Sequence, residues 1–247
     1  MVLRDLHVHT TFSDGKNTPE EVVLEAIARK MEVLGFSDHS YTAFDERWCM
    51  KKGDIPLYRA CIARLRARYG DKIKILRGIE QDFYSEEPTE GYDYVIGSVH
   101  YLRAGKAYIP VDESPELLRA AAEKHFRGDL YALIEEYYRT LARVVEKTGA
   151  DIIGHFDLIS KFNEGGALFD EADPRYLAAA QKAADILLKT GRPFEINTGA
   201  ISRGYRTAPY PSLALRDYIR QKGGSFVLSS DSHAKETLCF GFDTLEK

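Results

Sequence analysis

The sequence predicts an α/β fold in which seven strand–helix units close into a barrel of parallel strands. Short apolar runs typical of strands alternate with amphipathic helical segments along the 247 residues, and this alternation is typical of a parallel sheet. Polar residues follow nearly every strand, as at the rim of a barrel, whereas an open sheet would concentrate them at one switch point. The Gly-rich phosphate turn of many open sheets is also absent from the sequence. We therefore expect a closed barrel.

The apolar runs that predict strands begin near the N-terminus and recur along the chain. They span residues 2–7, 33–37, 74–78, 92–98, 151–154, 193–197 and 225–229. Apolar residues at helical spacing predict helices that begin at 19 and at about 115 and that span 57–69, 130–147, 174–190 and 213–222. For the first helix, Thr18 suits the N-cap, Pro19 suits the first position, and two glutamates favour the positive end of the helix dipole. Residues 101–128 form a longer insertion, with a turn at 110–115.

Composition is that of an ordinary globular protein, with 44% hydrophobic and 29% charged residues. The formal net charge of −4 excludes a broad basic field of the kind that nucleic-acid-binding proteins carry. The three cysteines are widely spaced, which argues against a disulfide scaffold or Cys-type zinc site and favours the reducing cytoplasm. No apolar stretch approaches the ~20 residues of a membrane span, and no signal peptide is recognisable. We expect a single domain over residues 1–247, and no heptad or apolar stripe indicates its oligomeric state.

Histidines and carboxylates gather directly after the predicted strands. Six of the seven histidines fall in short polar clusters, and Glu80 closes a further apolar run. The clusters are His7-Val8-His9 with Ser13-Asp14-Gly15, Ser37-Asp38-His39, Gly97-Ser98-Val99-His100, Gly154-His155-Phe156-Asp157 and Asp231-Ser232-His233. Neutral imidazole and carboxylate are the usual ligands of divalent transition metals. Their recurrence at strand ends predicts one metal centre assembled from distant segments.

The spacing within each cluster decides which side chains can face the same ion. Residues two apart on a strand point to the same side, so His7 and His9 can share an ion, and the Asp231 cluster repeats this spacing. Adjacent residues diverge, which makes His39 the candidate ligand of its cluster. Asp38 is then either an acceptor that orients an imidazole or an ordinary turn carboxylate.

The side chains of the remaining clusters also have alternative interpretations, as metal ligands, as groups that support a ligand or as ordinary structural residues. Small residues before His100 and His155 let the backbone approach its neighbours closely, and Asp157 either supports an imidazole or caps a helix. Glu80 is a carboxylate that can bridge two cations; alternatively, it is a solvated glutamate in a loop. His125 lies in a helical stretch without a polar cluster, so we assign it no metal role.

The predicted ligands are too many for a single ion. One ion takes about four to six ligands, so six histidines with Glu80, Asp14 and Asp231 suffice for two or three. A multinuclear centre lowers the pKa of a bridging water and clamps the attacking and leaving oxygens of an in-line displacement. Phosphate esters are therefore the expected substrates. Zinc, manganese and iron all suit such mixed ligands.

Phosphate also needs positive charge beyond the metals. Arg203 and Arg206 follow the strand over 193–197, on the same rim, and can bind phosphate oxygens bidentately. Alternatively, Arg203 and Arg206 are exposed loop arginines without a role in substrate binding. Lys161, in the loop after His155, is a third candidate by the same logic.

Taken together, these clusters resemble the PHP (polymerase and histidinol phosphatase) superfamily. The matching motifs, in order, are HxH with a following SDG, SDH, a strand-end Glu, GSVH, GHFD and a terminal DSH. The resemblance implies a distorted (β/α)7 barrel, with a trinuclear metal centre at the C-terminal rim of the strands. It assigns His7, His9, Glu80 and Asp231 to one ion, Glu80, His100 and His155 to a second, and His39, His233 and Asp14 to a third. Some relatives carry a histidine near the position of Asp14.

Within the superfamily the chain is most similar to histidinol-phosphate phosphatases. The similar segments are GSVHYL with the acidic insertion, GHFDLISKF and EINTGAISRGYRTAPYPS. This resemblance implies hydrolysis of L-histidinol phosphate in histidine biosynthesis, with a metal-bound hydroxide as nucleophile. Glu80 would bridge the metals, and Arg203 would neutralise phosphoryl oxygens. A histidine or aspartate at the rim would protonate the leaving alkoxide; Asp231 and His233 are the best placed, but each would already be a metal ligand, so the acid stays unassigned. Relatives usually continue into a last helix, so we expect a shortened C-terminal end.

Three other functions are compatible with these motifs. A phosphodiesterase or exonuclease would act on nucleotides or DNA ends, against which the acidic balance of the chain argues. A non-catalytic PHP-like binding module typically loses ligands, whereas the ligand set here is complete. A phosphatase for tyrosine-phosphorylated proteins needs a wider pocket, and pocket width cannot be read from sequence.

Overall fold

The computed structural model describes residues 3–245 and contains seven parallel strands in one sheet, in the order β1-β2-β3-β4-β7-β8-β9. These strands are β1 Arg4–Asp5, β2 Val33–Phe36, β3 Lys74–Asp82, β4 Tyr94–Ser98, β7 Ile152–Ile153, β8 Phe194–Asn197 and β9 Phe226–Ser229. Two further strands, β5 Tyr101–Ala104 and β6 Ala107–Pro110, pair with each other as an antiparallel hairpin.

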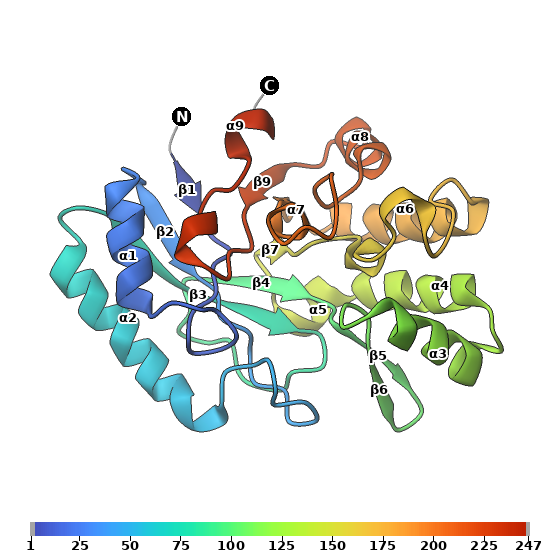
Figure 1. The fold of residues 1–247 in the computed structure, drawn as a ribbon, viewed down its shortest axis with the longest axis horizontal. Coiled ribbons are helices and arrows are strands. Elements are labelled where there is room, and N and C mark those ends of the chain that lie inside the picture. The colour runs from blue at the N-terminus through green and yellow to red at the C-terminus, as the bar shows by residue number, and fades with distance from the viewer. Residues whose placement is uncertain (1–2, 246–247) are drawn as a thin grey trace.

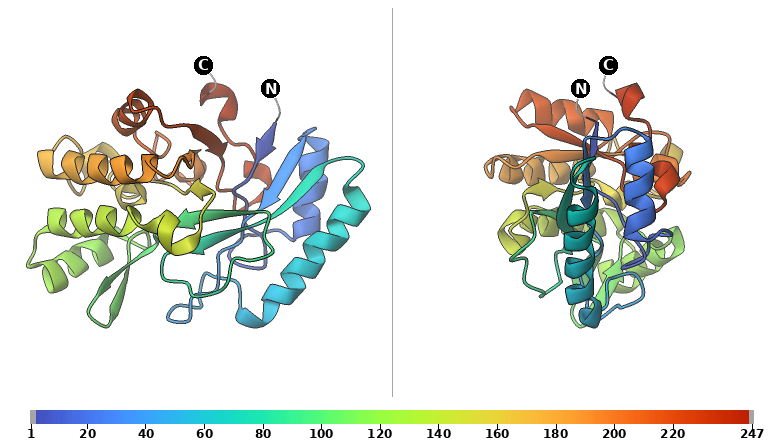
Figure 2. Two further views of the ribbon diagram at one scale, coloured as in Figure 1. Left: turned by 180° about the vertical axis from the view of Figure 1, so that it is seen from behind. Right: turned by 90° about the vertical axis from the view of Figure 1, so that its left-hand side faces the viewer.

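Helices cover the outside of the sheet. They are α1 Pro19–Ala28, α2 Ile55–Tyr69, α3 Pro115–Phe126, α4 Leu130–Leu141, α5 Val144–Thr148, α6 Pro174–Leu188, α7 Gly199–Ser202, α8 Leu213–Gln221 and α9 Phe242–Leu245. Single turns of 3₁₀ helix lie at Lys52–Asp54, Leu158–Ser160, Glu164–Gly166 and Lys235–Thr237. The front and rear views agree that α1 and α2 lie beside β2 and β3, with α3, α4 and α6 at the other end of the molecule (Figure 1, Figure 2). Among residues 3–245, no helix combines the length and apolar character that a membrane span requires.

The first and last strands meet just beyond their ends, so the sheet is nearly closed into a barrel. Val8 and Ser232 form a parallel bridge. The backbone N–H of His9 donates to the carbonyl of Ser232 over 2.8 Å, and the N–H of Ser232 donates to the carbonyl of His7 over 3.0 Å. This confirms the predicted barrel, and it places the first histidine cluster against the last one.

The N-terminal signals of the first helix act as predicted. Thr18 is the N-cap of α1 and Pro19 occupies its first turn. Thr18 accepts a bond from the backbone N–H of Glu21, whose side chain accepts from the N–H of Thr18 over 2.8 Å. This reciprocal arrangement is a capping box, which satisfies two donors that the helix itself leaves unpaired.

Two predicted elements have different limits in the structure. The run over 74–78 extends to Asp82 as β3, so Glu80 lies inside a strand rather than after it. The predicted helix over 130–147 is two helices, because the chain tightens into an i−3 turn between Arg143 and Thr140. The second of these helices, α5, packs on β4, where Gly97 leaves room for Val144 and Thr148.

Near the N-terminus and in the insertion, the structure also departs from the expected elements. The first strand is shorter than predicted, and Val2 lies outside the described residues. The insertion contains the hairpin β5–β6 as well as the expected helix, here α3. Gly105, with a φ of 61°, lies in the two-residue turn of the hairpin, where the left-handed backbone favours glycine.

A tyrosine fills the interior of the barrel below the polar rim. Tyr94 packs with Ile96, Ile152 and Val227, all from the strands. Its hydroxyl donates to the carbonyl of Leu6 over 2.6 Å. Gly78 and Gly35 make room for the ring, because a Cβ at either position would overlap Tyr94. The polar cluster at the rim therefore rests on a filled apolar floor.

Gly78→Ala should destabilise the fold by about 1–3 kcal/mol, because the added methyl group overpacks the barrel against a rigid ring. Urea unfolding followed by circular dichroism measures the change in the free energy of unfolding. Gly53→Ala is the matched control, since a Cβ there meets nothing within 4 Å. Equal stability of the two variants would contradict this view of the barrel interior.

Candidate metal centre

Glu80 lies at the middle of a cluster of imidazoles, with 1% of its surface exposed. Its Oε2 lies 2.8 Å from His39 Nδ1, 3.3 Å from His7 Nε2 and 3.6 Å from His9 Nε2, and its Oε1 lies 2.9 Å from His155 Nε2 and 3.4 Å from His100 Nε2. Ser98 donates a hydrogen bond to Oε1 over 2.7 Å. One carboxylate therefore contacts five histidines that come from four different strand ends.

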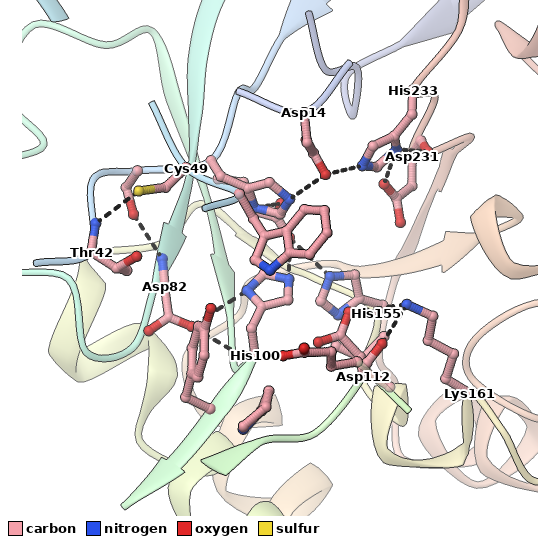
Figure 3. Close-up of a pocket in the computed structure, with 18 of the residues that line it drawn as sticks. Asp14, Thr42, Cys49, Asp82, His100, Asp112, His155, Lys161, Asp231 and His233 are labelled. Atoms are coloured by element: carbon pink, nitrogen blue, oxygen red, sulfur yellow. Dashed lines mark hydrogen bonds and ion pairs between the residues drawn. The ribbon is translucent and has the colours of Figure 1, made fainter. Parts of the chain in front are cut away.

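Asp231 and Asp14 complete the cluster on its other side (Figure 3). Asp231 Oδ1 lies 3.3 Å from His9 Nε2 and 3.4 Å from His233 Nδ1. Asp14 Oδ2 lies 3.1 Å from His233 Nε2 and 3.7 Å from His39 Nε2. Asp231 has a φ of 49°, which is unusual for a residue other than glycine and typical of strained functional positions. All nine predicted ligand side chains are thus brought together.

The cluster resolves into four overlapping groups, in each of which the candidate ligand atoms lie within 4.8 Å of one another. The groups are His7 with His9 and Asp231, His7 with Glu80 and His155, His39 with Glu80 and His100, and His9 with Asp14, His39 and His233. Their overlap indicates adjoining ion positions rather than one isolated site.

Several buried polar atoms of this cluster have no hydrogen-bond partner among the described residues. They are His7 Nε2, both ring nitrogens of His9, Asp14 Oδ1, Glu80 Oε2 and His155 Nδ1. Buried polar atoms nearly always have a hydrogen-bond partner. A group of buried nitrogen and oxygen atoms that lack one and face one another is therefore best explained as a binding site for cations. The residues present therefore fit a multinuclear centre of divalent metal ions.

The charges of the cluster shift the ionisation of Glu80 and His9 in the direction that metal binding needs. They shift that of His7, His39 and His100 in the opposite direction, because burial lowers the pKa of each imidazole but the neighbouring carboxylates outweigh it and raise that pKa. Burial alone would raise the pKa of Glu80, but the neighbouring imidazoles of His7, His39 and His100 outweigh it and hold that pKa well below the usual range. Burial, together with the like charges of His233 and His39, lowers the pKa of His9 to about 3. At neutral pH, Glu80 is therefore an anion and His9 is a neutral imidazole, which is its ligand form.

The cluster opens into a pocket with a volume of about 560 Å³. Arg203 and Lys161 lie on its wall. Arg203 donates to the backbone carbonyl of Asp231 over 2.7 Å and to its Oδ2 over 3.0 Å, while Lys161 donates to the carbonyl of Asp112 over 2.8 Å. Gly199 permits the contact between Arg203 and Asp231 Oδ2, because a Cβ there would lie 2.7 Å from both the Arg203 guanidinium and that oxygen.

Arg206, unlike Arg203 and Lys161, does not lie on the wall of the pocket. Its guanidinium donates to the carbonyl of Ser160 over 2.6 Å and to Glu171 over 3.1 Å, and it lies 3.4 Å from Glu164. The placement of Arg206 in this ion-pair network gives no support to the predicted contact with substrate phosphate.

Comparison with known proteins settles the family. The family model of the PHP domain matches residues 5–199. The chain belongs to the PHP domain family. A "Probable histidinol-phosphatase" of Deinococcus radiodurans is 31% identical over 251 residues, which cover 97% of this PHP protein and 90% of the relative.

Two solved structures share the fold of this PHP protein. One, from Listeria monocytogenes, superposes with a TM-score of 0.81 at 19% identity and covers 98% of this chain and 99% of its own. The other is histidinol phosphate phosphatase from Lactococcus lactis, complexed with zinc, L-histidinol and phosphate. It has a TM-score of 0.66 at 22% identity and covers 99% of this chain and 93% of its own. These likenesses confirm the distorted seven-stranded barrel.

A buried carboxylate that sequence reasoning missed orients two of the histidines. Glu195 Oε1 lies 2.7 Å from His7 Nδ1, and its Oε2 accepts from the backbone N–H of His155 over 2.9 Å. A proton on Nδ1, shared with Glu195, leaves the Nε2 lone pair of His7 directed at the cluster. The signal in the sequence is a single charge inside the apolar strand β8, a position that an unpaired glutamate almost never occupies.

Asp38 and Asp157 have roles other than the predicted ones. Asp38 accepts from the N–H and Oγ1 of Thr10 over 2.8 and 2.9 Å and from Ser13 Oγ over 2.7 Å, so it fixes the loop after His9 rather than an imidazole. Asp157 makes no capping bond from its side chain; instead, its Oδ2 accepts from the N–H of Ser212 over 2.9 Å. Burial raises the pKa of Asp157 to about 7.

Glu195→Gln should weaken zinc binding about 10–100-fold, because the amide no longer offers His7 a charged acceptor. Competition with a chromophoric chelator measures the affinity. Glu135→Gln, on the surface of α4, is the control and should bind zinc as the unaltered protein does. Unchanged affinity in Glu195→Gln would show that this carboxylate does not orient a ligand.

Proposed function

We propose that this PHP protein is a metal-dependent phosphomonoester hydrolase that converts L-histidinol phosphate to L-histidinol and phosphate, a step of histidine biosynthesis. The observation that carries the proposal is the convergence of nine ligand-type side chains in one cluster, which opens into a pocket whose wall holds Arg203 and Lys161. The name of the Deinococcus relative and the ligands of the Lactococcus structure support the choice of substrate.

Two to three divalent ions, zinc, manganese or iron, would occupy the cluster. By the resemblance to the family, His7, His9, Glu80 and Asp231 would hold one, Glu80, His100 and His155 a second, and His39, His233 and Asp14 a third. The donor groups of the structure place Glu80 with His7 and His155 and also with His39 and His100. Bound there, such ions activate water for attack at phosphorus and offset charge on the phosphoryl oxygens. Glu80, whose two oxygens face different histidines, would join neighbouring ions.

The residues of the pocket wall would bind and orient the ester. Arg203 and Lys161 would neutralise phosphoryl oxygens, since both are cations at the pocket surface. Asp231 keeps Arg203 in place through its backbone carbonyl and its carboxylate. As the bond between phosphorus and the alcohol oxygen breaks, that oxygen takes a proton, and His233, beside Arg203, is placed to relay it from water. Asp231 is an anion at neutral pH, because burial alone would raise its pKa but Arg203 and His7 outweigh that effect and hold the pKa well below the usual range.

The proposal includes the organisation and setting of the protein. Residues 1–247 would act as one PHP-type barrel domain, with the insertion at about 101–128 forming part of the pocket wall. The substrate would be a small molecule, and the reaction would need neither nucleic acid nor a membrane. A cytoplasmic setting accords with three cysteines that form no disulfide with one another.

A panel of phosphate esters tests the function. The purified protein should release phosphate from L-histidinol phosphate at a higher kcat/KM than from ethanolamine phosphate, glycerol phosphate or a dinucleotide. A chelator should abolish the activity, and added zinc or manganese should restore it, with about two to three metal equivalents bound per chain by elemental analysis. Preference for the dinucleotide would favour a phosphodiesterase instead.

Glu80→Gln should lower kcat by on the order of a thousandfold or more, because a neutral amide cannot join two cations. The rate is measured by phosphate release at saturating metal and substrate. Glu135→Gln again provides the control for a surface glutamate. Near-normal turnover by Glu80→Gln would exclude the bridging role.

A further inference from the structure

Two exposed aromatic side chains border the pocket beyond the histidine cluster. Trp48 is 49% exposed and Tyr205 is 42% exposed. Of the large hydrophobic side chains exposed within residues 3–245, these two alone line the pocket. Ligand pockets are typically lined by aromatic surface that the ligand covers, so each is a candidate contact for the part of the substrate that is not phosphate.

The loop that carries Trp48 is held firmly against the hairpin β5–β6. Phe44 stacks on Tyr108, with ring centroids 3.6 Å apart and planes 4° apart. Its edge also meets Tyr101 at a centroid distance of 4.9 Å. Arg47, next to Trp48, donates to both oxygens of Glu113 over 3.0 and 2.9 Å. An exposed indole on such a braced loop is preorganised for a ligand, which reduces the entropic cost of binding.

The polar groups on this wall are already engaged within the protein. Both oxygens of Glu113 are taken by Arg47, and the carboxylate of Asp112 pairs with Lys161 over 3.2 Å. The Lys161 ammonium also lies 5.0 Å from the ring centroid of Tyr205. The Arg47 guanidinium also lies 5.7 Å from the ring centroid of Trp48. Trp48 nevertheless keeps 49% of its surface exposed, more than Tyr205, the other large exposed hydrophobic side chain of the pocket.

We propose that Trp48 determines substrate specificity by stacking on the flat ring of the leaving alcohol. The inference rests on the proposed function, under which that alcohol is L-histidinol and the ring is an imidazole. An indole face attracts planar and cationic groups, and imidazole is planar and carries a positive charge when protonated. Trp48 would thereby distinguish L-histidinol phosphate from phosphate esters of similar polarity that have no ring.

Kinetics on two matched substrates test the proposal. Ethanolamine phosphate has the amine and the phosphate of L-histidinol phosphate but no ring. Trp48→Leu should lower kcat/KM for L-histidinol phosphate about tenfold, or about 1.4 kcal/mol. The loss should lie in KM, because stacking remote from phosphorus stabilises ground and transition states alike. Its kcat/KM for ethanolamine phosphate should stay within about twofold of the unaltered protein.

Two further variants separate stacking from folding. Trp48→Phe keeps an aromatic ring and should retain most of the preference. Leu57→Ala removes a side chain that is 60% exposed on α2, away from the pocket, and should leave both substrates unaffected. An equal loss on both substrates in Trp48→Leu would refute the stacking role.

Fluorescence provides an independent readout, because Trp48 is the sole tryptophan of the chain. L-histidinol should change its emission in a saturable way, whereas ethanolamine should not. Unchanged emission at L-histidinol concentrations that inhibit hydrolysis would overturn the proposal. If the unaltered protein shows no preference for L-histidinol phosphate, the proposed function is wrong and this inference falls with it. If the preference exists and survives intact in Trp48→Leu, this inference alone is wrong.

Discussion

The burial of one carboxylate among five imidazoles is the interaction on which the rest of the site depends. An isolated charge inside a protein is costly, so Glu80 requires compensating positive charge on all sides. Neutral imidazoles do not supply that charge, and a fully protonated set would place like charges beside one another. Divalent cations bound by the carboxylate and the ring nitrogens would supply the positive charge and would leave the imidazoles neutral, which avoids repulsion among them. The same requirement explains why so many buried ring nitrogens lack a protein partner.

Buried carboxylates outside the histidine cluster hold the strands together where the strands themselves are too short to do so. β1 and β7 have only two residues each, so few ladder bonds hold the barrel closed. Asp5, fully buried, accepts from the backbone of Ser230 over 3.2 Å and of Cys239 over 2.9 Å, which ties the first strand to the last. Glu195 and Asp38 similarly join separate segments at the rim. The precision of the metal centre therefore comes largely from side chains rather than from the sheet.

The pocket is chemically asymmetric, and its two ends have different origins in the chain. The inner end is built from strand termini and presents histidines, carboxylates and Arg203. The outer wall comes from the insertion and from the loop before α2, where aromatic rings and paired charges predominate. Such a division suits an ester with an anionic group at one end and a ring at the other. Changes in the outer wall could alter the alcohol that is recognised without disturbing the inner end.

The sequence alone predicted the barrel, the order of its seven strands and the nine candidate ligands that the structure brings together, because local spacing and the ends of parallel strands carry that information. Glu195, the tie through Asp5 and the different fates of Arg203 and Arg206 were decided only by the tertiary structure. A buried glutamate in a strand and two arginines three residues apart look alike in sequence whether they orient a histidine, contact substrate or brace a loop. Their partners come from segments up to 234 residues away, and only folding selects among them. The role of a side chain is fixed by the group that satisfies its charge, and that group is rarely a neighbour in the chain.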